Sequence, residues 1–148
     1  MNEKMYLIDN NVLSHLSPAQ RTTGFFHARC RIPSEVLHEA DGYSDAEVLK
    51  EAEYPTTASV LKFLQTIMAT VPEDDTSLVN LYANKGAADP ILVACALDGM
   101  RETANQLFGW TWVIVSNDNA VRAKAKEFCV ESCTREEFFS RTQGSWTT

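Results

Sequence analysis

The sequence WVIVSND at residues 112–118 joins an apolar run to a short polar turn. Its first four residues are β-branched or aromatic, which favours a buried strand. The sequence MYLID at residues 5–9 has the same form, an apolar run that ends at an acidic residue. A weaker strand is predicted at residues 30–32 and a short last one near Val130. These continuous apolar runs are typical of parallel strands that are covered by helices on both faces.

Helical patterns separate the predicted strands. Residues 57–71 carry apolar side chains at three- and four-residue spacing, and Pro72 ends this pattern. Asp89 and Pro90 have the form of an N-cap and a first helical position, and the seven apolar residues after them predict a buried helix. Further helices are predicted over residues 11–16, 33–40, 76–84 and 120–128, and a last one that Thr134 and Glu137 open as a capping box. The alternation predicts an α/β fold, a three-layer α/β/α arrangement with a central, mostly parallel sheet.

The length and composition suit a single folded domain. The chain has 148 residues, of which 45% are hydrophobic, and we expect one domain over residues 1–141 with a polar tail over 142–148. The sequence has no apolar run of about 18 residues and no pattern of a signal peptide, which predicts a soluble, cytoplasmic protein. Four cysteines without a CxxC pair and three histidines without ligand spacing argue against a zinc site.

The net charge of −7 is concentrated in one segment. Residues 34–53 hold seven acidic residues and one lysine, and most of this run is interpreted as a solvated helical face. An acidic chain is an unusual nucleic-acid binder. A nuclease remains compatible with this charge, because bound divalent cations can supply the positive charge at its site.

Four acidic residues occupy positions where ligands bind in parallel sheets. Asp9 and Asp118 each follow a predicted strand, Glu39 lies in the helix after the weaker strand, and Asp89 opens the buried helix. Ligands bind beyond the carboxyl ends of such strands, so we expect the four to project into one region. Their mutual repulsion would be relieved by a hard divalent cation such as Mg²⁺, which prefers carboxylate oxygen.

Each of these acids also has a purely structural interpretation. In this interpretation Asp89 and Asp118 are only helix N-caps. Glu39 is then a surface residue, and Glu35 on the same helical face is a rival for its role. Asp9 is less easily explained in this way, because Asn10 or Asn11 can cap the helix that follows it.

Four sequence blocks carry a resemblance to a known family. They are LIDNNVL at residues 7–13, IPSEVLHE at 32–39, ADPILVACA at 88–96 and VIVSND at 113–118, and a closing EEF lies at 136–138. In this order they resemble the PIN domain, the fold of VapC-type toxin ribonucleases and related metal-dependent nucleases. The resemblance spans residues 5–139, although residues 42–57 match none of its motifs.

The resemblance implies a catalytic and metal-binding site of Asp9, Glu39, Asp89 and Asp118 around one or two Mg²⁺ or Mn²⁺ ions. A metal-activated water would hydrolyse phosphodiester bonds of RNA, which makes the chain a metal-dependent endoribonuclease. The residues expected to hold the acids by hydrogen bonds are Asn11, Ser116 and Asn117. The residues expected to contact phosphate groups are Lys85, Arg122 and Lys124.

The toxin interpretation also implies partners. We expect a small antitoxin protein that blocks the acidic pocket, and a homodimer for which the candidate contact residues are Phe25, Phe26, Phe63 and Leu64. The alternatives are a PIN-like nuclease that acts in RNA processing or on structured DNA, and a PIN-like interaction module without catalysis. A haloacid-dehalogenase phosphatase is disfavoured because Asn11 stands where that family has its second Asp. A receiver domain is disfavoured because Asn10 and Asn11 replace its paired acids.

Overall fold

The computed structural model describes residues 3–70, 88–104, 106 and 109–146, and for residues 88 and 89 it describes the backbone only. Within these residues five strands form a parallel sheet in the order β3-β2-β1-β4-β5. The strands are β1 (Lys4–Ile8), β2 (Cys30–Pro33), β3 (Glu53–Tyr54), β4 (Thr111–Val115) and β5 (Glu131–Cys133). The helix expected over residues 76–84 lies outside the described residues.

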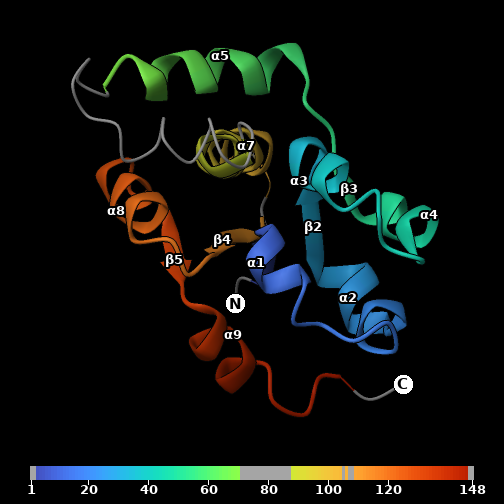
Figure 1. Cartoon of the computed structure of the whole chain (residues 1–148). Helices are drawn as coiled ribbons and strands as arrows, with labels where there is room; N and C mark the ends of the chain where they lie inside the picture. The colour runs from blue at the N-terminus through green and yellow to red at the C-terminus, as the bar shows by residue number, and fades with distance from the viewer. Residues whose placement is uncertain (1–2, 71–87, 105, 107–108, 147–148) are drawn as a thin grey trace.

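Helices connect the strands and cover the sheet (Figure 1). The α-helices are α1 (Asn10–Leu13), α2 (Gly24–Arg29), α3 (Ser34–Glu39), α4 (Ala46–Leu49), α5 (Ala58–Met68), α7 (Ala88–Thr103), α8 (Asn119–Glu127) and α9 (Arg135–Arg141), and two short 3-10 helices span Gln20–Thr22 and Lys50–Ala52. None of the helices in the described ranges combines the length and apolar character needed to cross a bilayer.

The side chains of β1 divide the core between the two faces of the sheet. Met5 and Leu7 pack in a cluster with α5, α7 and α8, whereas Tyr6 and Ile8 pack in a second cluster with α1, α2, α3 and α9. This division follows from the two-residue period of a strand, which sends successive side chains to opposite faces. Both faces of β1 are therefore buried, and the predicted three-layer α/β/α fold is confirmed.

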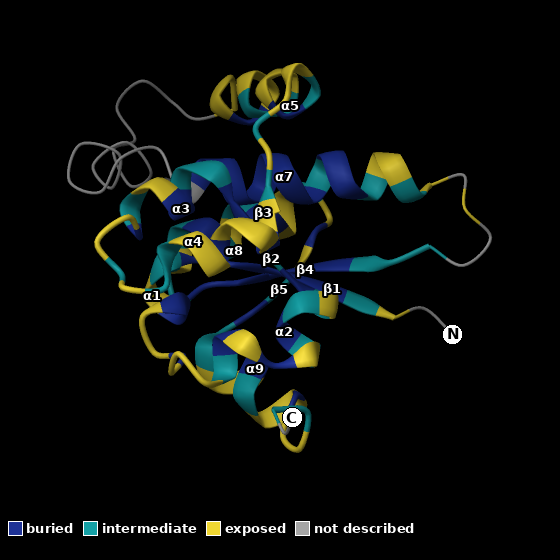
Figure 2. Ribbon diagram, turned by 90° about the vertical axis from the view of Figure 1, so that its right-hand side faces the viewer, coloured by how far each residue is buried: buried dark blue, intermediate teal, exposed yellow. Residues whose placement is uncertain are grey.

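Helix α7 is the buried helix that its apolar sequence predicts. It begins at Ala88, so Asp89 lies in the first turn and the prediction that Asp89 is the N-cap was wrong. Pro90 still fits, because the backbone N–H groups of the first turn have no partner within the helix. Helix α5 packs against α7 on the side away from the sheet, as Figures 1 and 2 show.

Two segments have structure that the sequence analysis did not predict. Residues 42–57, which match no motif, form α4, a 3-10 turn and the edge strand β3. In the expected polar tail, Thr142 is buried and its hydroxyl donates to the carbonyl of Phe138 at 2.8 Å. Trp146 packs edge-on against Phe25, with 4.8 Å between ring centroids. These contacts hold the C-terminal segment against the hydrophobic core on the face of the sheet that α2 and α9 cover.

Candidate active site

The strand order places a topological switch point between β1 and β4. From β1 the chain adds β2 and β3 on one side of the sheet, and it then returns to add β4 and β5 on the other. In open α/β sheets ligands bind at such a switch point, outside the carboxyl ends of the strands. Asp9 directly follows β1 and Ser116 directly follows β4, so the predicted acidic turns lie at this position.

Asp9 is a buried carboxylate with two oriented oxygens. Its side chain is only 6% exposed. Oδ1 accepts a hydrogen bond from the backbone N–H of Asn10 at 2.7 Å, and Oδ2 accepts one from the hydroxyl of Ser116 at 2.7 Å. Asp9 is thus itself the N-cap of α1, and the expectation that Asn10 or Asn11 would cap this helix was wrong. An ionised carboxylate has about four acceptor positions, so capping does not prevent a further contact.

Ser116 links the two acidic turns. Besides donating to Asp9, its Oγ accepts the backbone N–H of Asp118 at 3.1 Å. Oδ1 of Asp118 accepts from the backbone N–H of Ala120 at 2.8 Å and caps α8. The expected hydrogen bond between Ser116 and an acid of the site is therefore present, and the structure brings the turns of Asp9 and Asp118 together.

The structure describes the other two acids less completely. Glu39 is the last residue of α3, and its Oε1 atom is buried. Helix α3 contacts both α1 and α7, and Figure 2 shows α1 and α3 together on the side opposite the N-terminus. Asp89 lies in the first turn of α7, but its side chain is outside the described residues. The rival Glu35 lies one turn earlier on α3. Burial raises the pKa of Cys95 in the middle of α7, and the charges of Asp98 and then Glu35 add to this rise.

Metal ligation has only partial support in the geometry. No group of three or more His, Cys, Asp or Glu side chains close enough to hold an ion is found among the described residues, which exclude the side chain of Asp89. The described acids are Asp9, Glu39 and Asp118, and of these Asp9 and Asp118 are joined through Ser116. This donor chemistry suits a hard divalent cation such as Mg²⁺ or Mn²⁺.

The candidate phosphate contacts lie in different surroundings. Nη1 of Arg122 donates to the carbonyl of Ser116 at 2.9 Å, and Nη2 donates to Oδ1 of Asn119. Arg122 therefore stabilises the turn after β4 through its hydrogen bond to Ser116. The ammonium of Lys124 contacts Thr70 at 3.1 Å and Glu127 at 2.8 Å, between α8 and the end of α5. Lys85 lies outside the described residues.

Three residues that the sequence analysis did not select lie beside the acidic turns. Nη1 of Arg135 lies 3.3 Å from Oδ1 of Asn11 and 3.1 Å from both ring nitrogens of His15. The hydroxyl of Tyr43, from the unmatched segment 42–57, donates to Oδ1 of Asn10 at 3.4 Å. The contact that the structure gives the Asn11 side chain is thus with Arg135, whereas we expected it to hold an acid. Nothing in the sequence indicated this position for Arg135 beyond its residue type. Arg135 lies 120 residues from His15 in the sequence, and only the fold brings the two together.

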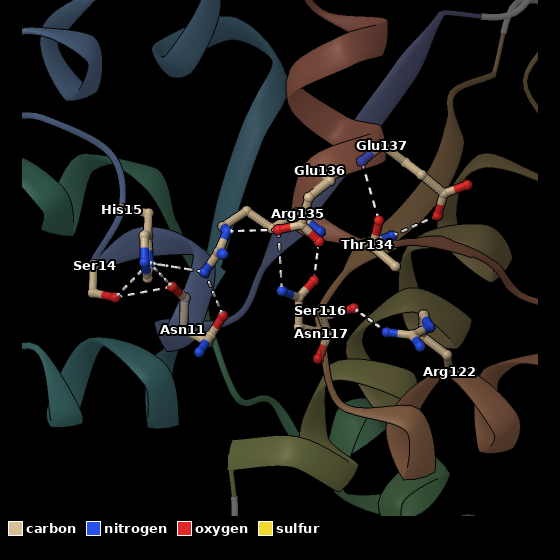
Figure 3. A network of polar contacts seen from close by, with 10 residues as sticks. All are labelled: Asn11, Ser14, His15, Ser116, Asn117, Arg122, Thr134, Arg135, Glu136 and Glu137. Atoms are coloured by element: carbon tan, nitrogen blue, oxygen red, sulfur yellow. Dashed lines mark hydrogen bonds and ion pairs between the residues drawn. The ribbon is translucent and has the colours of Figure 1, made fainter.

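Asn117 connects the turn after β4 to α9. Its Oδ1 accepts the backbone N–H of Arg135 at 2.7 Å, and its Nδ2 donates to Oε2 of Glu136 at 3.4 Å (Figure 3). The hydrogen bond from Asn117 is the main reason why the pKa of Glu136 lies below its ordinary value. Asn117 therefore fixes α9 beside the acidic turns.

Three of the cysteines are poor candidates for a nucleophile. Burial raises the pKa of the Cys133 thiol to about 11, and it also raises those of Cys30 and Cys95. Only the thiolate is nucleophilic, so these buried thiols stay protonated and inert near neutral pH.

The candidate dimer residues belong largely to the core. Phe26 is 1% exposed and Phe25 packs against the same cluster. Phe63 and Leu64 on α5 are half-buried against the α7 side of the core. On α5 the side chains of Leu61 and Met68 are the exposed large apolar ones.

Comparison with known proteins adds no relative. No family model matches the chain, and no curated protein matches it.

Proposed function

We propose that the chain is a PIN-like, metal-dependent endoribonuclease whose site comprises Asp9, Glu39, Asp89 and Asp118. The observation that supports this best is the chain of hydrogen bonds from Asp9 through Ser116 to the turn of Asp118, at the switch point of the sheet. Metal-assisted hydrolysis of a phosphodiester needs carboxylates held in fixed directions, and Asp9 is held so at the switch point of the sheet. The resemblance of the four sequence blocks to the PIN family supports the same function.

The proposed roles of the side chains follow from their contacts. Asp9, Glu39, Asp89 and Asp118 would hold one or two Mg²⁺ or Mn²⁺ ions. When bound, such an ion supplies positive charge at a phosphoryl group and lowers the pKa of a water molecule. Ser116 keeps one oxygen of Asp9 in a fixed direction, and the N-cap bond fixes the other. The carboxylate then needs to move little during the reaction, which lowers the free-energy cost of reorganising the site.

The proposal extends to the biological role. As in the toxins that the chain resembles, we propose a small antitoxin protein as its partner, and the target is an RNA. A nuclease of RNA processing, a nuclease of structured DNA and an interaction module without catalysis are outcomes that the following experiment distinguishes.

The experiment measures cleavage of labelled single-stranded RNA, structured RNA and hairpin DNA with Mg²⁺, Mn²⁺ or EDTA. We expect metal-dependent cutting of RNA by the wild-type protein and none by Asp9→Asn. Asn is also a good N-cap, so this variant should fold. The matched control is Asp41→Asn, which removes an exposed acid near the end of α3 and should cut like the wild-type protein. Equal cutting by Asp9→Asn and wild type would refute the site, and cutting of DNA alone would change the substrate class.

A further inference from the structure

Arg135 stands at the centre of a polar cluster beside the proposed site. We define the Arg135 cluster as Arg135, His15, Asn11 and Glu136. Nη1 of Arg135 contacts the ring of His15 and the amide oxygen of Asn11, and its Nε lies 3.0 Å from Oε2 of Glu136. Figure 3 shows the guanidinium extending from α9 towards Asn11 and His15. The cluster therefore joins the first and last helices of the chain.

The cluster also connects the two turns that carry Asp9 and Asp118. The backbone N–H of Arg135 binds the Asn117 side chain, in the turn after β4. Its guanidinium binds the Asn11 side chain, in helix α1 directly after the Asp9 turn. Arg135 is thereby held at the same edge of the sheet as the turns of Asp9 and Asp118.

The positive charge of Arg135 is available to an anion. Its side chain is 25% exposed, and its charged partner Glu136 is 63% exposed. An ion pair this open to water stabilises the protein little, so an incoming anion can replace Glu136 at low cost. The contacts of Nη1 with the Asn11 side chain and the His15 ring orient the guanidinium, and neither partner carries a negative charge.

We propose that Arg135 contacts a backbone phosphate of the RNA next to the scissile one, with His15 and Asn11 as positioning residues. This inference rests on the proposed function and names the substrate contact of that same site. The planar guanidinium presents paired N–H donors that match the oxygens of a phosphate. A chain with a net charge of −7 needs such local cations to hold RNA beside its own carboxylates.

The surface beyond the cluster leaves room for the nucleic acid. A shallow hollow of about 640 Å³ borders His15 and is also lined by Pro18, Arg21 and Tyr43. In the proposed complex the RNA would continue from Arg135 past His15 into this hollow. Aromatic and imidazole rings at such a surface offer stacking positions for unpaired bases.

The experiment measures binding of a fluorescein-labelled single-stranded oligoribonucleotide by anisotropy, in EDTA so that nothing is cut, over a series of salt concentrations. We expect Arg135→Ala to bind about tenfold more weakly. For this variant the slope of log affinity against log salt concentration should be shallower by about 0.7, which corresponds to the loss of one phosphate contact on a single strand. Arg135→Lys should recover the slope and part of the affinity, because lysine keeps the positive charge but lacks the paired N–H donors of the guanidinium.

Two controls separate this role from a structural one. Arg141→Ala removes the same charge from the same helix, where Arg141 pairs with Glu131 and Glu137, and should leave the slope unchanged. His15→Ala should weaken binding without changing the slope, since it removes orientation and no charge. Melting temperatures of all variants show whether each protein is folded.

The outcomes distinguish this inference from the proposed function. If wild-type protein binds and cuts RNA while Arg135→Ala keeps the wild-type affinity and slope, the inference falls and the nuclease stands. If binding depends on Arg135 but no RNA is cut with Mg²⁺ or Mn²⁺, the contact stands without catalysis. If the folded wild-type protein binds no RNA in EDTA, the inference falls, and the cleavage experiment with Mg²⁺ or Mn²⁺ decides the proposed function separately.

Discussion

The hydroxyl of Ser116 donates a hydrogen bond to Oδ2 of Asp9 at 2.7 Å, across 107 residues of sequence. Both residues are buried, and they sit at the ends of the neighbouring strands β4 and β1. The parallel register makes this contact possible. Ile8 pairs with Val115, so Asp9 and Ser116, the residues that follow them, lie at the same end of the two strands. The bond therefore couples the stability of the sheet to the orientation of the proposed catalytic acid.

Ser116→Ala should lower both stability and cleavage. The change removes a donor to a buried carboxylate and an acceptor for the N–H of Asp118. A lost hydrogen bond to a charged group costs about 2 kcal/mol, which urea unfolding would measure. Ser140→Ala, at an exposed position of α9, is the control and should unfold like the wild-type protein. Equal stability of the two variants would contradict the role given to Ser116.

Mn²⁺ should raise the melting temperature of the wild-type protein. An ion that binds only the folded state at 100 times its dissociation constant adds about 2.7 kcal/mol, which corresponds to a rise of several degrees for a domain of this size. The rise should vanish in Asp9→Asn and persist in Asp41→Asn. Thermal unfolding followed by circular dichroism gives the answer. A melting temperature that millimolar Mn²⁺ leaves unchanged would argue against a metal site.

The elements around the core were predictable because their signals are local. The apolar runs at β1 and β4, the stripe of α5 and the all-apolar start of α7 each depend on a few consecutive residues. The short elements α4 and β3 were not predictable from residues 42–57. Their positions depend on distant contacts, such as the buried ion pair between Arg21 and Asp45 at 2.8 Å, and no local pattern reports these.

The candidate site was predictable only in part for the same reason. Asp9, Ser116 and Asp118 follow strands, so the rule for parallel sheets places them at one edge. Arg135 and His15 meet only because α1 follows β1 and α9 follows β5 at that edge, where β4 alone separates the two strands. Capping was also misjudged at Asp9, because a residue can serve as N-cap and still offer its remaining lone pairs to a ligand.

Thr134→Ala should destabilise α9. Oγ of Thr134 accepts the N–H of Glu137 at 3.1 Å, and the Glu137 carboxylate accepts the N–H of Thr134 at 2.9 Å. This reciprocal capping box confirms the sequence prediction, and loss of the N-cap costs about 1 kcal/mol. Thr134→Ser keeps the hydroxyl and should stay close to the wild-type stability in urea unfolding. A loss of similar size in both variants would mean that the methyl group matters and the cap does not.

Tyr54→Phe should remove part of the alkaline sensitivity of the fold. The Tyr54 hydroxyl donates to Oδ2 of the buried Asp98 at 2.6 Å, and Ser59 donates to Oδ1 at 2.5 Å. Burial, and then this bond to Asp98, raise the pKa of Tyr54 far above its ordinary value near 10. Because the folded pKa is raised, the stabilisation is fully present below about pH 10 and is lost as the pH rises further.

Unfolding free energies between pH 7 and pH 11 would test this pH dependence. At pH 7 Tyr54→Phe should lose about 1–3 kcal/mol, since Asp98 loses a donor in a buried place. The difference between the two proteins should then shrink above about pH 10, where only the wild-type protein loses the contribution of Tyr54. Burial also raises the pKa of Tyr6, but Tyr6 is present in both proteins and cancels in the difference. A constant difference over the whole range would show that Tyr54 and Asp98 are not coupled in the folded state.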